Sequence, residues 1–150
     1  MKNTIGNHVF EYVCPIQPEH GSDGIRRLMP QGEYKNVGCV PLNRYGRGPF
    51  CRFRIPSGLH MDGVYAITAG DNIMYVGECV DLSKRFNAGY GQISPKNCYK
   101  GGQETNCRIN SLVLQHAEDG QPLGLWFLRT PDRWKVETEL IERYDPPWNL

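Results

Sequence analysis

The sequence from residue 63 to residue 79 reads GVYAITAGDNIMYVGEC and holds two runs rich in apolar and β-branched residues. The runs are separated by residues 70–72, Gly-Asp-Asn, which are typical turn formers. Two such runs around a short polar segment predict two strands joined by a tight turn, here Gly63–Ala69 and Ile73–Cys79. The stretch therefore predicts an antiparallel β-hairpin.

The register of this hairpin decides where its two tyrosines lie. With a three-residue loop, Ala69 pairs with Ile73, and Tyr65 then lies opposite Gly77. Side chains alternate along a strand, so Tyr65 and Tyr75 are expected on one face, with open space beside the Tyr65 ring at Gly77. A loop of two or four residues would place the tyrosines on opposite faces. Ordinary half-buried strand tyrosines are the simpler interpretation of the same pattern.

Helical and strand patterns follow the hairpin. The predicted elements are a short helix capped by Asp81 that runs to about Asn87, a second helix capped by Thr105 or Asn106, a strand over 123–128 that is buried on both faces, and a last helix from Thr130 or Asp132 to about Tyr144. The order from residue 63 is β-β-α-α-β-α, which predicts an α+β fold.

The last predicted helix carries a carboxylate on its apolar face. Apolar residues recur at helical spacing, namely Trp134, Leu140, Ile141 and Tyr144. Glu137 lies within that stripe, and a carboxylate on a core face must be paired, protonated or bound to a metal. A structural pair with an arginine or tyrosine and a functional role both agree with the pattern.

These elements carry a set of motifs that resembles a known family. The motifs in chain order are GVY at 63–65, YVG at 75–77, DLSKRF at 81–86, ETELI at 137–141 and Asn149. Together they resemble the GIY-YIG nucleases over about residues 61–150. The segment from 89 to 110 is most similar to the branch that contains small type II restriction endonucleases. The resemblance implies a central three-stranded sheet flanked by helices, and a metal-dependent phosphodiesterase that acts on DNA.

The roles of the family's site residues are carried over one by one. By this resemblance Tyr65 would be the general base or would orient the attacking water, and Arg85 would hold the scissile phosphate. Glu137 would bind Mg²⁺, for which Mn²⁺ can substitute, and Tyr75 and Asn149 would position these groups. From its residue type alone, Arg85 is most simply a surface arginine, which is the usual case, and a phosphate clamp is the functional interpretation.

One position departs from the family pattern. The family usually has a tyrosine or histidine four residues after the arginine, whereas this chain has Gly89 there. Tyr90 follows directly, and a loop at Gly89 would allow its side chain to turn inward, so Tyr90 is the candidate for that role. A tyrosine has a pKa of about 10 and needs nearby positive charge to act as a base, which Arg85, Lys84 or a hydrated metal would supply.

Charge is distributed unevenly along the chain. The net charge is +1, but residues 1–60 hold 8 basic and 4 acidic residues, whereas residues 118–150 hold 4 and 7. An arginine-rich stretch can follow a phosphate backbone or form a solvated loop, and amides and guanidinium groups can read base edges. The candidate DNA contacts are Lys84, Arg44, Arg47, Arg52, Arg54, Lys96, Lys100, Gln103, Asn106 and Arg108.

The first 60 residues are rich in glycine and proline and predict short strands and loops. We expect residues 1–60 to be an N-terminal extension for DNA recognition or dimerisation, and residues 61–150 to be the nuclease domain. The chain has no long apolar run and no apolar segment near its start, so we expect a cytoplasmic protein with reduced cysteines and no membrane contact. A zinc site is the alternative use of the N-terminal thiols and imidazoles, namely Cys14, Cys39, Cys51, His8 and His20.

The sequence thus predicts a Mg²⁺-dependent, sequence-specific endonuclease for double-stranded DNA. A homodimer is expected because palindromic sites are usually cut by symmetric dimers. Two alternatives remain open. One is a structure-specific repair or recombination nuclease with the same site, and the other is a DNA-binding module on the same fold that has lost catalysis.

Overall fold

The computed structural model describes all residues from Met1 to Leu150. The chain divides into two compact units, each made of segments that are distant in the sequence. Unit 1 consists of Met1–Ile16, Ile55–Arg85 and Gln121–Leu150, and unit 2 consists of Gln17–Arg54 and Phe86–Gly120. The expected functional division near residue 60 stays a prediction. No helix combines the length and the apolar character needed to cross a membrane.

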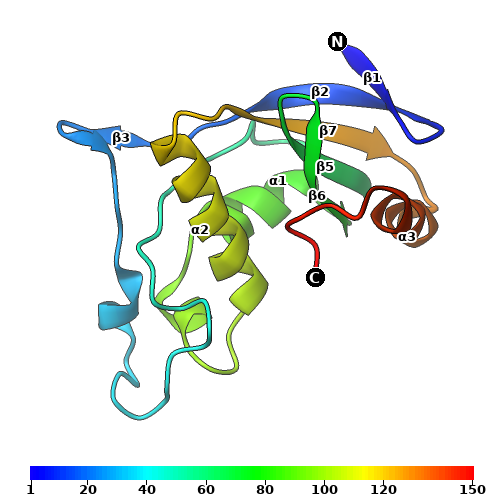
Figure 1. Cartoon of the computed structure of the whole chain (residues 1–150). Coiled ribbons are helices and arrows are strands. Elements are labelled where there is room, and N and C mark those ends of the chain that lie inside the picture. Colours follow the sequence, from blue (N-terminus) through cyan, green and yellow to red (C-terminus); the bar gives the residue numbers. More distant parts are fainter. The chain divides into compact units, whose positions relative to one another are not determined.

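Unit 1 is built on one antiparallel sheet (Figure 1). Its strands, in spatial order, are β1 (Lys2–Ile5), β2 (His8–Ile16), β7 (Leu123–Arg129), β5 (Gly63–Ala69) and β6 (Asn72–Cys79). The predicted α+β class is confirmed, but the prediction of three strands is wrong, because the sheet has five. β2 pairs with β7, whose backbone groups would otherwise form an open edge, and β1 continues the sheet outward.

The β5–β6 hairpin keeps the predicted pairing with a different loop. Ala69 pairs with Asn72, so the loop has two residues rather than three, and the predicted loop is wrong. An irregularity after Ile67 leaves Met74 as an extra residue on β6 and restores the register. Ile67 therefore pairs with Tyr75, as predicted.

The last helix, α3 (Arg133–Tyr144), packs against this sheet. Val136 and Leu140 are its buried residues, and they join a core that includes Val64, Ala66 and Val76. The predicted apolar stripe is therefore wrong in part, because it contained Trp134 and Tyr144, whose exposed fractions are 66% and 38%. Val136, two residues after Trp134, is buried instead, so the inward stripe of α3 is rotated from the predicted one.

Strand β7 is buried less evenly than predicted. Leu123, Leu125 and Phe127 are buried, while Gly124, Trp126 and Leu128 are only partly covered. The prediction of a strand buried on both faces is therefore wrong. The alternation fits an antiparallel sheet in which one face is packed more tightly than the other.

Unit 1 also contains the short helix α1 (Leu82–Arg85). Asp81 caps it as predicted, since its carboxylate accepts from the backbone N–H of Lys84 at 2.9 Å. The α-helix ends at Arg85, and the π-helical turn η2 (Phe86–Tyr90) follows in the sequence, so the predicted end near Asn87 is wrong.

Unit 2 contains little regular structure. Its elements are β3 (His20–Gly21), β4 (Gly24–Ile25), η1 (Pro30–Glu33), η2, η3 (Pro95–Cys98) and α2 (Glu104–Glu118). Its buried centre is formed by Phe50, Ile93, Cys98, Tyr99 and Cys107. Helix α2 begins at Glu104 and has no side-chain cap, so the predicted cap at Thr105 or Asn106 is wrong.

Candidate active site

Two tyrosines lie on the same face of the β5–β6 hairpin. Tyr65 on β5 is paired with Gly77 on β6, as the sequence predicted, and its side chain is 1% exposed. The ring centroids of Tyr65 and Tyr75 are 6.2 Å apart with the ring planes inclined by 38°. A Cβ atom at Gly77 would lie 2.4 Å from both Cζ and Oη of Tyr65. The Tyr65 ring therefore occupies the space that a side chain at position 77 would need.

Strand β6 is the edge of the sheet, so half of its backbone groups have no strand partner. The C-terminal segment supplies hydrogen-bond partners for these backbone groups at Val76. The side chain of Asn149 accepts from the N–H of Val76 at 2.9 Å and donates to its carbonyl oxygen at 2.9 Å. The backbone N–H of Trp148 donates to the carbonyl oxygen of Met74 at 2.9 Å. The end of the chain thus pairs with the edge strand and satisfies its polar groups.

Glu78 presents its backbone on the same outer edge, because residues two apart in a strand direct their N–H and C=O groups to the same side. Its carbonyl oxygen accepts from Nη2 of Arg85 at 3.4 Å. Its N–H donates to the carboxylate of Glu137. The backbone of Glu78 therefore forms hydrogen bonds with an arginine from α1 and with a glutamate from α3.

Glu137 is partly buried, and its pKa is raised above the usual value. The main cause is burial, which removes water from the carboxylate, and the second is the nearby carboxylate of Glu78. The N–H of Glu78 and the positive charge of Arg85 act in the opposite direction. Glu137 is thus an under-compensated acid beside an arginine, the kind of group that gains from a cation.

An ion pair beside this group was not predicted from the sequence. Oε2 of Glu78 accepts from Nε of Arg133 at 2.7 Å, and the two side chains are 22% and 20% exposed. Arg133 precedes Glu137 by one helical turn, and Glu78 follows the glycine of the second motif. That helical spacing is the signal that could have indicated Arg133. The pair orders one carboxylate next to the carboxylate of Glu137.

Five of the six predicted catalytic residues therefore meet one short segment of β6. Tyr75 lies within the segment 75–78, and the ring of Tyr65 lies against Gly77. The side chains of the other three form hydrogen bonds with the backbone of this segment, namely Arg85, Glu137 and Asn149. The sixth, Tyr90, belongs to unit 2. There it is 2% exposed, its ring packs edge-on against Phe86, and its role stays a prediction.

The predicted DNA-contacting residues lie on both units. Lys84 is exposed on α1 of unit 1. The others belong to unit 2, where Arg44, Arg47, Arg54, Lys96, Lys100 and Gln103 are exposed and Arg52, Asn106 and Arg108 are partly covered. Arg44 is paired with Glu104 at 2.8 Å. The guanidinium groups of Arg44 and Arg108 both lie near the ring of Tyr45, at 5.1 and 5.9 Å from its centroid.

The residues at the β6 edge fit a hard divalent cation. Mg²⁺ is commonly held by one or two carboxylates, waters and substrate phosphate oxygens. Glu137 supplies such a carboxylate, and its raised pKa marks a charge that is not fully compensated. The structure has no group of three or more histidine, cysteine or acidic side chains placed to hold a metal. Among the thiols of the alternative zinc site, Cys39 is exposed, Cys14 is partly covered and Cys51 is buried.

Comparisons of this chain with protein-family models, with curated proteins and with solved structures found no match. We therefore infer the function from the arrangement of side chains around β6.

Proposed function

We propose that this protein is a Mg²⁺-dependent endonuclease for double-stranded DNA of the GIY-YIG type. One observation carries the proposal, namely that five residues spread over 85 positions of the sequence, from Tyr65 to Asn149, meet β6 between residues 75 and 78. Their chemistry suits phosphodiester hydrolysis, which requires a group that handles a proton, a phosphate clamp and a cation ligand. The resemblance in the sequence motifs points to the same residues.

Arg85 is the proposed phosphate clamp. Its guanidinium is oriented by the carbonyl oxygen of Glu78, and it is exposed at the surface of unit 1, where a DNA strand can reach it. A guanidinium group donates two parallel hydrogen bonds to a phosphoryl group, and this charge stabilises the transition state more than the ground state.

Glu137 is the proposed metal ligand. Its carboxylate is fixed by the N–H of Glu78 and lies within the electrostatic reach of Arg85, so a cation bound there would share the phosphate with the arginine. When bound, Mg²⁺ supplies positive charge to the phosphate and to the departing 3′ oxygen. The ion pair between Glu78 and Arg133 restrains the second carboxylate and keeps it from moving onto Arg85.

Tyr65 and Tyr75 are the proposed groups for water and proton handling. The absence of a side chain at Gly77 leaves room for the Tyr65 ring, and the Tyr75 ring lies next to the Tyr65 ring on the same face. In this role Tyr65 accepts the proton of the attacking water or orients that water, while Tyr75 limits the movement of the Tyr65 ring. Asn149 fixes the backbone of Val76, which lies on β6 between Tyr75 and Glu78.

Sequence specificity, the homodimer and the DNA contacts of unit 2 belong to the same proposal. The exposed basic residues there can follow the phosphate backbone, and the amides of Gln103 and Asn106 can read base edges. A symmetric dimer would match a palindromic site.

The test is digestion of a long, sequence-diverse DNA with Mg²⁺, with EDTA in its place, and with the Glu137→Gln variant. Discrete fragments that require both the metal and Glu137 are expected. A metal-dependent smear, or preference for branched over plain duplex DNA, would favour the structure-specific nuclease instead. DNA binding without any cleavage would leave only a DNA-binding module.

A further inference from the structure

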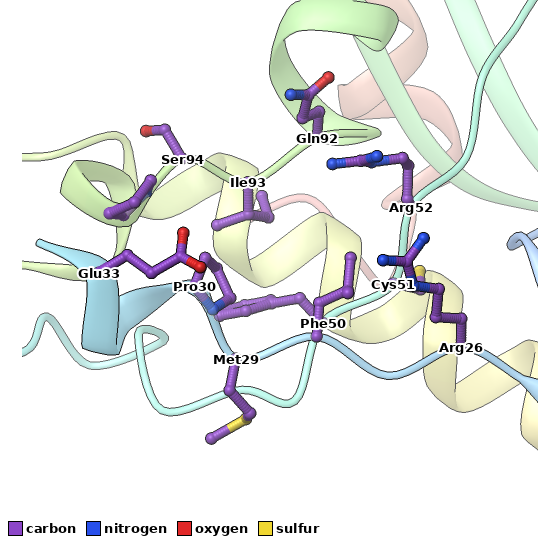
Figure 2. Close-up of a pocket in the computed structure, with 12 residues that line it drawn as sticks. Arg26, Met29, Pro30, Glu33, Phe50, Cys51, Arg52, Gln92, Ile93 and Ser94 are labelled. Atoms are coloured by element: carbon purple, nitrogen blue, oxygen red, sulfur yellow. The ribbon is translucent and has the colours of Figure 1, made fainter.

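Unit 2 contains a pocket of about 360 Å³ that the proposed active site does not use. Figure 2 shows the guanidinium groups of Arg26 and Arg52 at one end and the carboxylate of Glu33 at the other. Phe50 and Ile93 lie between these ends. The pocket is therefore polar at both ends and apolar in its middle, and its volume lies at the small end of the range for ligand pockets, roughly 300–1,000 Å³.

The two arginines are held near each other by the backbone of one residue. The N–H of Arg26 donates to the carbonyl oxygen of Glu19 at 2.9 Å, and the N–H of Glu19 donates to the carbonyl oxygen of Arg52 at 2.7 Å. Neither guanidinium is part of an ion pair. The positive charge at this end of the pocket is thus concentrated and uncompensated, which favours an anionic ligand.

Arg52 carries the strongest indication that this pocket binds a ligand. Its Nε atom is buried and has no hydrogen-bond partner. A buried donor without an acceptor is costly to the folded state, and such groups are rare in native proteins. Because the side chain lines the pocket, a bound phosphate oxygen would satisfy this donor.

The walls of the pocket are fixed before any ligand binds. Leu28 and Phe50 exchange two backbone hydrogen bonds, at 2.8 and 2.9 Å. The buried side chain of Asn110 accepts from the N–H of Cys51 at 2.9 Å and donates to its carbonyl oxygen at 2.8 Å. These contacts hold the strand-like segment that carries Arg52, so binding would require little ordering of the backbone.

We propose that this pocket binds a single nucleotide unit, with the phosphate between Arg26 and Arg52 and the base against Phe50 and Ile93. Gln92, an exposed residue that lines the pocket, carries an amide that can read a base edge, and Glu33 can accept from an exocyclic amino group. The choice of a nucleotide over other phosphorylated compounds rests on the proposed nuclease function. The unit can come from a strand of DNA or from a free nucleotide, since both present the same chemistry.

The experiment measures binding with the full-length Glu137→Gln protein in EDTA, so that no probe is cut. The probes are the deoxynucleoside 5′-monophosphates, the corresponding nucleosides, inorganic phosphate and a short single-stranded oligodeoxynucleotide, each titrated by calorimetry. Arg52→Met keeps the apolar stem and removes the buried donor, Arg26→Ala removes an exposed guanidinium, and Lys35→Ala is the control for an exposed charge in the same unit.

We expect the monophosphate or the strand to bind, and both arginine variants to weaken that binding by roughly 10- to 100-fold. Lys35→Ala should bind as the parent does, and Arg52→Met should melt at an unchanged or higher temperature because an unsatisfied donor is gone. A strand that binds roughly tenfold tighter than the monophosphate identifies DNA as the source, and equal affinity identifies a free nucleotide.

Two results would overturn the inference. In the first, Arg26→Ala and Arg52→Met bind every probe as tightly as the parent does. In the second, inorganic phosphate binds as tightly as the monophosphate. Because the readout is binding without metal, a protein that fails to cut DNA can still support the pocket. Conversely, a protein that cuts DNA as proposed but gives either of these two binding results overturns the pocket alone.

Discussion

Gly77 lies directly opposite Tyr65 on the neighbouring strand, and the tyrosine ring fills the space that a side chain at Gly77 would take. A glycine on the neighbouring strand thus sets the position of the proposed proton-handling group. Both residues belong to the two sequence motifs, and the contact explains why a glycine ends the second one.

The first prediction concerns this contact. Gly77→Ala would place a Cβ atom 2.4 Å from the Tyr65 ring, so we expect a loss of roughly 1–3 kcal/mol of unfolding free energy and displacement of the ring. Urea denaturation measures the first effect and DNA cleavage the second. Gly124→Ala on β7 is the matched control, because its Cβ would lie 3.2 Å from the Tyr12 ring. Equal stability of the Gly77→Ala and wild-type proteins would contradict the account.

The second prediction concerns the pH dependence of stability at Glu137. Burial, and then the charge of Glu78, raise its pKa above the usual 4.5. The folded state therefore holds this proton more tightly than the unfolded chain does, and ionised Glu137 lowers stability once the pH exceeds the raised pKa. Below 4.5 the carboxyl is protonated in both states and the penalty vanishes.

We therefore expect Glu137→Gln, in EDTA, to melt at a higher temperature than the wild type in neutral and mildly alkaline buffer. The difference should disappear in acid below pH 4.5. Glu142→Gln, at an exposed position of the same helix, should show no such pattern. A Glu137→Gln protein that is less stable than the wild type at neutral pH would show that the carboxylate is fully compensated.

The third prediction concerns the ion pair between Glu78 and Arg133. Arg133→Met leaves a partly buried carboxylate unpaired next to Glu137, and we expect a loss of roughly 1–3 kcal/mol, less than the loss for a fully buried pair. The double variant Glu78→Gln with Arg133→Met should recover part of this loss, because the unpaired charge is gone. Chemical denaturation of four proteins, namely the wild type, Arg133→Met, Glu78→Gln and the double variant, measures the coupling, and purely additive effects would argue against it.

The fourth prediction concerns the C-terminal pairing with β6. Asn149→Ala removes both hydrogen bonds to Val76, so we expect a loss of roughly 1–3 kcal/mol and faster hydrogen exchange at the Val76 amide. Leu150→Ala, at a neighbouring residue that is 86% exposed, is the control. Unchanged exchange at Val76 in Asn149→Ala would mean that the side chain does not hold the edge strand.

The sequence predicted the hairpin well because its information is local. The pairing of Tyr65 with Gly77 was correct even though the loop was not. The extra residue Met74 on β6 compensates for the shorter loop, and no residue type marks such a bulge in advance. Burial on α3 was harder to predict, since Val136 and Trp134 compete for the inner face and only the packed sheet selects between them.

Non-local features could not be read from the pattern. The pairing of β2 with β7 joins segments more than a hundred residues apart, and nothing in either strand names its partner. The ion pair of Glu78 with Arg133 and the buried donor of Arg52 likewise depend on which surfaces meet. The candidate catalytic residues could be named from the sequence because each belongs to a short motif or to a fixed position relative to one. The contacts around them could be described only from the structure.

The most direct test of the central claim is the rate at which new DNA ends appear with Mg²⁺. Wild type, Arg85→Ala and Glu137→Gln are compared on the same sequence-diverse DNA, with thermal melting to verify that each protein is folded. We predict cleavage by the wild type and a loss of at least about a hundredfold in both variants. Wild-type cleavage that persists in folded Arg85→Ala and Glu137→Gln, or no cleavage by the wild type at all, would contradict it.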